Sequence, residues 1–422
     1  MDSQQKQSES SFLILALSTV VLGLAVGLAA MLLSFFLENI EAFFLNFHES
    51  TANPGPAGTW PWRRLISVTI GGIIAAGAWW AIRRPNQPKI VGIKGALAGK
   101  RMPVLGTIVH VVTQIFYVGT GGSVGRELAP RQAGVLLGQI WQRILDRLGW
   151  RNLSAEDEKL LLAAAAGAGF AGVYIAPITG MLFSVEMLVK KTTMKTVSVS
   201  MGMAMIAMLV GSIAKGFHPY YLVGDGKFSV TILFIATVIG PLAGVFGAIA
   251  RKAFAWAEKT QVQSAKIFAF LPAMALITGI VAFFTPDIMG NGRALAQGAL
   301  NAESGKVVIF LLILAVLKLV ITFATLKAGG SGGTLTPAIA TGAVLGLLVG
   351  AALHIYFPSI PLWQSTALGA AAFLAASQEA PLMALFMIFE ISHLESSALL
   401  PLAWVVTLSA IASRIYLKLS KK

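Results

Sequence analysis

A carboxylate stands between long hydrophobic runs at Glu127, directly after the glycine-dense stretch Gly121-Gly122-Ser123-Val124-Gly125-Arg126. An ionisable side chain at bilayer depth costs roughly 2.5 to 3.5 kcal/mol, so such a group marks an ion or substrate pathway. The glycines permit the unusual backbone angles and the close approach that a cradle of backbone amides requires. Glu127 is therefore the first candidate functional residue, and the chemistry we expect is the passage of an ion or polar substrate.

The composition shows what kind of elements must position this carboxylate. The chain has 422 residues, of which 56% are hydrophobic and 12% charged, whereas about 25% charged residues is usual for a globular protein. Backbone groups must be paired in lipid, and the alternating pattern of a membrane barrel is absent, so the apolar runs are helices. We predict an all-α polytopic membrane protein. About eleven runs lie near residues 12–37, 66–82, 104–119, 160–189, 199–214, 228–250, 267–285, 306–327, 338–356, 366–389 and 398–413, some of them split or re-entrant.

The net charge of +14 is concentrated in three clusters. Six basic residues and no acid lie between Arg83 and Arg101, and the other clusters are Lys190, Lys191 and Lys195, and Arg414, Lys418, Lys421 and Lys422. The positive-inside rule places all three clusters in the cytoplasm. We expect an integral protein of the plasma (inner) membrane of a prokaryote. Nucleic-acid binding is the weaker interpretation, because no recognised binding module accompanies the charge.

The metal-ligating residue types give no site. There is no cysteine, which excludes disulfides and thiolate metal sites, and the five histidines have no metal-ligand spacing. We therefore expect neither a metal nor a cofactor.

Two elements recur along the chain at an offset of about 205 residues. Pro130 and Pro337 each follow a glycine-rich turn that contains a Gly-Ser pair, and Ala176-Pro177 and Ala380-Pro381 each precede a glutamate by nine residues counted from the proline. Weak repeats with interrupted helices commonly place a transporter's substrate site at the repeat interface. We predict one transmembrane domain over residues 1–422, built as an inverted repeat of a first half (about 12–214) and a second half (about 228–413), with no cytoplasmic regulatory domain.

The motifs resemble those of the CLC family of chloride channels and proton-coupled chloride transporters. Gly125-Arg126-Glu127 is similar to the family's Gly-Lys/Arg-Glu-Gly-Pro motif, and Gly333-Thr334-Leu335-Thr336-Pro337 is similar to its Gly-X-Phe-X-Pro filter motif. Tyr174 to Glu186 and Ala370 to Glu390 resemble two further family segments. The resemblance implies an anion site formed by Gly125, Arg126, Glu127, Gly333, Thr334, Leu335 and Thr336. It also implies a homodimer with one pore per subunit, joined through Ile178 to Ser212 and Pro381 to Ile411.

Several family residues are missing. The first filter motif, with its chloride-ligating serine, would fall at Gln87 to Val91, which contains no serine. The family's phenylalanine is Leu335, and Tyr416 comes too early to be the tyrosine that contacts the central anion. Proton-coupled members tend to carry a second glutamate where this sequence has Met187.

Helix N-termini explain how such a filter holds an anion without a full positive charge. Each N-terminus offers amide donors and roughly half a positive charge. Ionised, Glu127 would compete with the anion for these donors; protonated, it would lose that attraction and swing away, so the gate couples to pH and voltage. The alternative is a structural ion pair with Arg126, which the divergent directions of adjacent helical residues disfavour.

A second carboxylate, Glu186, is a candidate proton relay. Lys190 and Lys191 follow it at i+4 and i+5, so a surface ion pair is the competing interpretation. Asp287, Asn291 and Arg293 surround Gly290 and Gly292 in a stretch that we expect at a helix end.

The function we predict is chloride transport through a pore gated by Glu127, with passive, channel-like flux. The alternatives are a proton-coupled chloride antiporter and a transporter of another anion such as fluoride. An enzyme is disfavoured, because the scattered Ser and His residues form no recognised catalytic motif.

Overall fold

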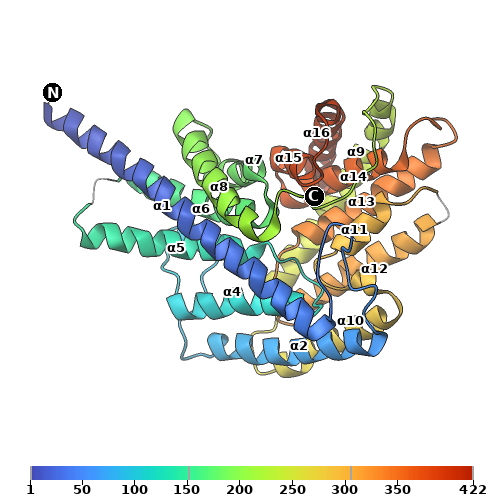
Figure 1. Ribbon diagram of the computed structural model, residues 1–422, viewed down its shortest axis with the longest axis horizontal. Coiled ribbons are helices and arrows are strands. Elements are labelled where there is room, and N and C mark those ends of the chain that lie inside the picture. Colours follow the sequence, from blue (N-terminus) through green and yellow to red (C-terminus); the bar gives the residue numbers. More distant parts are fainter. Residues whose placement is uncertain (1, 151–152, 305–306, 421–422) are drawn as a thin grey trace. The chain divides into compact units, whose positions relative to one another are not determined.

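The computed structural model describes residues 2–150, 153–304 and 307–420, and within these ranges the chain is built from helices (Figure 1). Lys421 and Lys422 of the predicted C-terminal basic cluster lie outside the described residues. Among the described residues, eight helices are long and apolar enough to cross a membrane. They are α1 (Asp2–Ile40), α2 (Pro61–Arg83), α8 (Met194–Lys215), α9 (Ile232–Lys259), α10 (Ile267–Phe284), α12 (Val308–Lys327), α13 (Leu335–Leu353) and α16 (Leu399–Leu419).

Two of the predicted apolar runs are broken helices. The run 160–189 divides into α6 (Ala155–Tyr174), α7 (Pro177–Leu182) and the π-helix η2 (Phe183–Val189), and the run 366–389 divides into α14 (Leu362–Gln378) and α15 (Pro381–Ile391). The other shorter helices are α3 (Ile93–Leu97), α4 (Val104–Gly119), α5 (Leu128–Arg147), α11 (Arg293–Leu300), the π-helix η1 (Glu41–Leu45) and the short turns η3 (Pro286–Ile288) and η5 (Ser396–Ala398).

The two breaks have the same backbone geometry. Each first helix ends on a left-handed residue, Ile175 (φ 54°) or Glu379 (φ 58°), and the next helix begins with a proline at its first position, Pro177 or Pro381. Proline is tolerated at the first helical position because no intrahelical bond needs its missing N–H. The match between two sites 204 positions apart confirms the internal repeat at the level of local structure.

The chain divides into two compact units. The first contains the residues up to Phe35, Pro85–Val112 and Glu127–Phe217; the second contains Phe36–Arg84, Thr113–Arg126 and the residues from His218 onward. These are packing units, whereas the halves of the repeat are defined along the sequence, so the two divisions do not coincide.

Small residues bring the helices of the first unit into close contact. Helix α6 packs against α5 and α8, and it is buried along almost its whole length from Leu160 to Tyr174. A Cβ atom at Gly134 of α5 would clash with the carbonyl oxygen of Ala165, and one at Gly211 of α8 would clash with that of Gly172. Helices in a membrane pack through such small residues because close backbone approach supplies the van der Waals contact.

The second unit repeats this packing. Helices α13 and α14 pack together, as do α9 and α16, and α2 and α10, the last pair lying side by side in Figure 1. A Cβ atom at Gly342 of α13 would clash with the carbonyl oxygen of Gly369 of α14. Gly342 and Gly369 occupy the positions that Gly134 and Ala165 occupy in the first repeat, so corresponding helix pairs approach at corresponding residues.

Candidate functional site

Glu127 is buried at the start of a helix in the first unit. It is the residue before α5, and its side chain is fully buried. Its carbonyl oxygen accepts a hydrogen bond from Nε of Arg131 at 2.7 Å, and the Arg131 guanidinium lies 5.0 Å from the ring centre of Phe183. The N-terminal end of α5 is where the helix dipole favours an anionic group. Arg131 was not among the predicted site residues, although its i+4 spacing from Glu127 could have indicated it.

In the second unit, the two glycine-rich loops of the repeat meet at their corresponding glycines. The backbone N–H of Gly125 donates to the carbonyl of Gly333, and that of Gly333 donates to the carbonyl of Gly125, each at 2.7 Å. Gly121 and Gly329 take φ angles of 104° and 105°, which side-chain-bearing residues rarely adopt. The predicted filter residues Gly125 and Gly333 are thus brought together from positions 208 residues apart.

Thr334, Leu335 and Thr336 form the start of α13. Thr334 is the N-cap residue, and both Leu335 and Thr336 are buried. The side chain of Gln378, the last residue of α14, also reaches this point, since its Nε2 donates to Oγ1 of Thr334 at 3.5 Å. The N-terminus of α13 therefore follows directly after Gly333. Leu335, which the resemblance aligns with the family's phenylalanine, is buried at this N-terminus.

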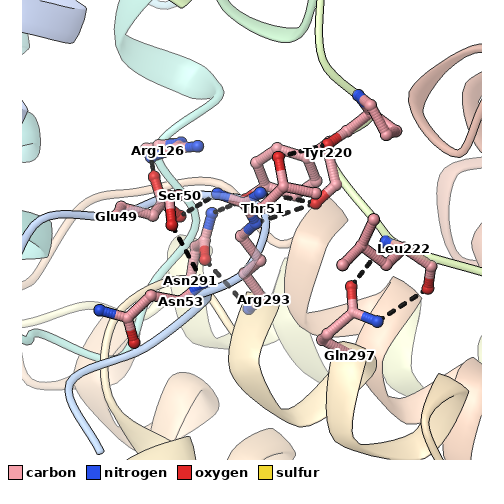
Figure 2. Close-up of polar contacts among 11 residues, drawn as sticks. Glu49, Ser50, Thr51, Asn53, Arg126, Tyr220, Leu222, Asn291, Arg293 and Gln297 are labelled. Atoms are coloured by element: carbon pink, nitrogen blue, oxygen red, sulfur yellow. Dashed lines mark hydrogen bonds and ion pairs between the residues drawn. The ribbon is translucent and has the colours of Figure 1, made fainter. Parts of the chain in front are cut away.

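Arg126 binds a carboxylate that the sequence did not indicate. Its Nη1 lies 2.5 Å from Oε2 of Glu49, and the other oxygen of Glu49 lies 3.2 Å from Nη1 of Arg293 (Figure 2). The ion pair that the structure shows for Arg126 is therefore with a carboxylate other than the neighbouring Glu127 that the sequence had offered. Glu49 went unnoticed because it is 77 residues away in the chain and carries no local motif.

Tyr220 packs against both arginines. Its ring centre is 4.0 Å from the guanidinium carbon of Arg293 and 5.4 Å from that of Arg126. Burial raises the pKa of Tyr220 to about 12, so its hydroxyl stays neutral and accepts a hydrogen bond from Nδ2 of Asn291 at 2.8 Å. Arg293 is the first residue of α11, so the predicted helix end around Asn291 and Arg293 is the beginning of a helix.

A buried lysine holds the first glycine-rich loop in place. Lys318 of α12 is fully buried, and its Nζ donates to Oγ of Ser123 at 2.8 Å and to the carbonyls of Ile288 and Gly290 at 2.9 and 2.6 Å. These three bonds use all three donors of an ammonium group. Lys318 could be noticed in the sequence, because it is the one charged residue between Lys306 and Lys327, the ends of the apolar run 306–327. Its partners could not be identified from the sequence.

The other sequence candidates are placed as follows. Glu186 lies within η2, next to Met187, and Lys191 has its Nζ 3.3 Å from Oε2 of Glu156. The segment Gln87–Val91 is non-helical and largely exposed. Tyr416 lies on α16, where its ring centre is 5.3 Å from Nζ of Lys252.

Known proteins share both the sequence pattern and the fold. Residues 71–414 match the model of the voltage gated chloride channel family. The voltage-gated ClC-type chloride channel ClcB of Escherichia coli O17:K52:H18 (strain UMN026 / ExPEC) is 29% identical over 373 residues, which cover 84% of each chain.

Two solved structures are similar in fold. A slow cyanobacterial Cl−/H+ antiporter has a TM-score of 0.77 at 20% identity, and a CLC-type fluoride/proton antiporter has a TM-score of 0.64 at 17% identity; the match covers 96% of both chains in each case. At these identities the two structures establish the fold alone. The chain therefore belongs to the voltage-gated chloride channel family, the CLC family, as an all-α integral membrane protein with an inverted repeat that moves anions across the bilayer.

Proposed function

We propose that this protein is a chloride pathway gated by Glu127 and that its flux is passive. The observation that carries the proposal is the position of Glu127: a fully buried carboxylate at the start of α5, two residues after the glycine whose backbone is paired with Gly333. Burying an ionisable group in a membrane protein costs free energy, so such a group is interpreted first as part of an ion or substrate pathway.

The gate works by competition for backbone donors. An ionised Glu127 is a tethered anion at a helix N-terminus, where the dipole and the amide donors also attract chloride. Protonation removes the charge of the carboxylate and with it this attraction. Chloride then takes the place of the carboxylate, so the rate of flux rises as the external pH falls.

The residue expected on a separate proton path to the gate favours passive flux over coupled exchange of chloride and protons. Coupling needs a group that passes protons to the gate along a path separate from the anion, and Met187 carries a thioether with no exchangeable proton. The exposed segment Gln87–Val91 also lacks the serine that closes the anion site in the family. Antiport remains the second candidate, since Glu186 is a carboxylate one residue from Met187.

Purified protein in liposomes tests the proposal. The liposomes start with an outward chloride gradient and no pH difference. We expect chloride efflux to dissipate this gradient without uphill movement of protons. Uphill proton uptake driven by chloride contradicts passive flux, and its loss in Glu186→Gln would identify the relay. Glu156→Gln is the matched control, because Glu156 is an exposed carboxylate paired with Lys191. Chloride, nitrate and fluoride compared in the same assay decide the preferred anion.

The predicted arrangement in the membrane is part of the same proposal. The basic residues between Arg83 and Arg101 face the cytoplasm by the positive-inside rule, in the inner membrane of a prokaryote. Helix α2 ends at Arg83, so the segment 46–60 before its start lies on the opposite, external side. The functional unit is a homodimer with a separate pore in each subunit.

A further inference from the structure

The carboxylate of Glu49 bridges two buried arginines in the second unit. Each of its oxygens faces a different guanidinium, that of Arg126 at 2.5 Å and that of Arg293 at 3.2 Å. The side chains of all three residues are 4–6% exposed. We call Glu49, Arg126, Tyr220, Asn291 and Arg293 the Glu49 cluster (Figure 2).

Arg293 has several partners besides Glu49. Nε and Nη2 of Arg293 donate to the carbonyl of Tyr220 at 3.0 and 2.7 Å, and its backbone N–H donates to Oδ1 of Asn291 at 3.1 Å. Arg126 directly follows Gly125, whose backbone is paired with Gly333. Tyr220 packs against both guanidinium groups. The guanidinium of Arg293 is thus held by a backbone carbonyl, and both guanidinium groups pack on the ring of Tyr220.

The carboxylate, by contrast, comes from irregular chain. Glu49 lies in the non-helical segment 46–60 between η1 and α2. Two hydrogen-bonded contacts of this segment follow Glu49 in the sequence. Ser50 and Asn53 bond to each other, and Oγ1 of Thr51 donates to the carbonyl of Pro219 at 2.9 Å. A change in the backbone of residues 46–50 therefore moves the carboxylate, whereas the hydrogen bonds of Arg293 to Tyr220 and Asn291 do not involve that segment.

A pocket borders the cluster on the side of this segment. Its lining includes Glu49, Arg126, Asn291 and Arg293, and also a second carboxylate, Glu41, which is buried. Two guanidinium groups that converge on one point bind a small anion by charge and by directed N–H donors. In the structure that point is filled by the Glu49 carboxylate, and the pocket provides space beside it.

We propose that Arg126 and Arg293 form a second anion-binding station, at which the Glu49 carboxylate is a tethered occupant that chloride or another small inorganic anion replaces. The inference rests on the proposed function, since the station holds anions at Arg126, the residue that precedes the proposed gate Glu127. Glu49 acts here as Glu127 acts at the filter: each is a carboxylate that stands where the transported ion binds.

Halide binding to Glu49→Gln tests this station. The substitution keeps the shape of the side chain and removes the charge that competes with the anion. At constant ionic strength, with gluconate replaced by chloride, we expect the melting temperature of Glu49→Gln to rise by several degrees more than that of the unchanged protein, because an ion that binds only the folded state stabilises it. Equilibrium bromide binding should increase by one ion per subunit.

The matched control is Asp157→Asn. Asp157 is also a buried carboxylate in an ion pair, at 2.5 Å from Nζ of Lys195, but its single cationic partner is half exposed. Its loss should lower the melting temperature in chloride and gluconate alike. Adding Arg293→Gln to Glu49→Gln should remove the extra bromide ion.

Equal melting temperatures in the two salts and unchanged bromide stoichiometry for Glu49→Gln would overturn the station and leave Glu49 as a structural ion-pair partner. Should Glu49→Gln fail to fold in either salt, Glu49→Asp decides, because its shorter side chain cannot reach both arginines. Anomalous scattering from bromide between Arg126 and Arg293 in that variant supports the station, and its absence refutes it. These readouts measure binding with Glu127 intact, so they fail independently of the flux assay that tests the gate.

Discussion

At the scale of single residues, Glu127 places a carboxyl group in a fully buried position. We predict that Glu127→Gln raises chloride flux and removes most of its pH dependence, because the neutral amide imitates the protonated, displaced gate. Liposome efflux measured between acidic and neutral pH checks this. Glu395→Gln, which neutralises an exposed carboxylate, is the control and should leave both rate and pH profile as they are. A Glu127→Gln protein with unaltered rate and pH profile would make Glu127 structural.

Lys318 is also an ionisable residue with a fully buried side chain. Its ammonium satisfies Ser123 Oγ and two backbone carbonyls of the loop before α11. We predict that Lys318→Met destabilises the protein by about 2 kcal/mol, since buried acceptors left without donors cost about 1–3 kcal/mol, and that it slows chloride flux by loosening the Gly121–Gly125 loop. The loss is limited because removing a buried charge is itself favourable.

Thermal unfolding in detergent and liposome flux measure the two effects of Lys318→Met. Lys418→Met is the control: Lys418 is exposed on α16, and substitutions at exposed positions usually change stability by less than about 0.5 kcal/mol. A Lys318→Met protein as stable and as active as the control would show that the three hydrogen bonds do not hold the loop.

At the scale of elements, the site depends on two helix pairs that approach at their glycines. Helix α5 starts directly after the proposed gate Glu127 and packs on α6, and α13 starts in the second predicted filter motif and packs on α14. A Cβ atom at Gly134 or at Gly342 would meet a backbone carbonyl of the facing helix. A backbone carbonyl cannot rotate away as a side chain can, so the helices themselves must separate.

We therefore predict that Gly134→Ala and Gly342→Ala each destabilise the protein by roughly 1–3 kcal/mol, the usual cost of overpacking, and reduce flux by displacing the helix N-termini. Gly298→Ala is the matched control within α11, because the nearest atom to its new Cβ lies 3.9 Å away. Alanine is the better helix former, so the control should be neutral or slightly stabilising. Equal melting temperatures for all three variants would contradict the packing argument.

At the scale of the whole molecule, the proposed homodimer uses the segments Ile178 to Ser212 and Pro381 to Ile411. Both carry exposed apolar side chains, among them Leu209 of α8 and Trp404 of α16. Exposed apolar side chains are expected where a helix contacts lipid and also where it contacts a second subunit, because lipid tails are as apolar as leucine side chains.

The absence of cysteine from the chain gives a direct test of the dimer. We predict that Leu209→Cys in lipid is joined to a second subunit by a short thiol cross-linker, whereas Ile309→Cys, exposed on α12 outside the predicted segments, is not. Subunit counting of labelled protein in the same membranes should give two. Monomers alone, or equal cross-linking of both variants, would refute the predicted interface.

The sequence alone determined the features that depend on local chemistry. Hydropathy indicated membrane helices because lipid leaves the backbone no other way to pair its polar groups. Glycine, proline and their spacing located the internal repeat and the interruption in each half, since these residues act on their own backbone. The carboxylate at Glu127 stood out because a charge is costly in an apolar run.

Only the tertiary structure decided which distant residues meet. The mutual hydrogen bonds of Gly125 and Gly333, the ammonium of Lys318 on Ser123, and the carboxylate of Glu49 between Arg126 and Arg293 join residues that are 77 to 244 positions apart. Such contacts have no periodicity and no motif, because they arise from the path of the folded chain and not from any one segment. Arg126 shows the difference: its motif predicted its place beside the gate, but its buried partner was supplied by a loop that no sequence pattern connects to it.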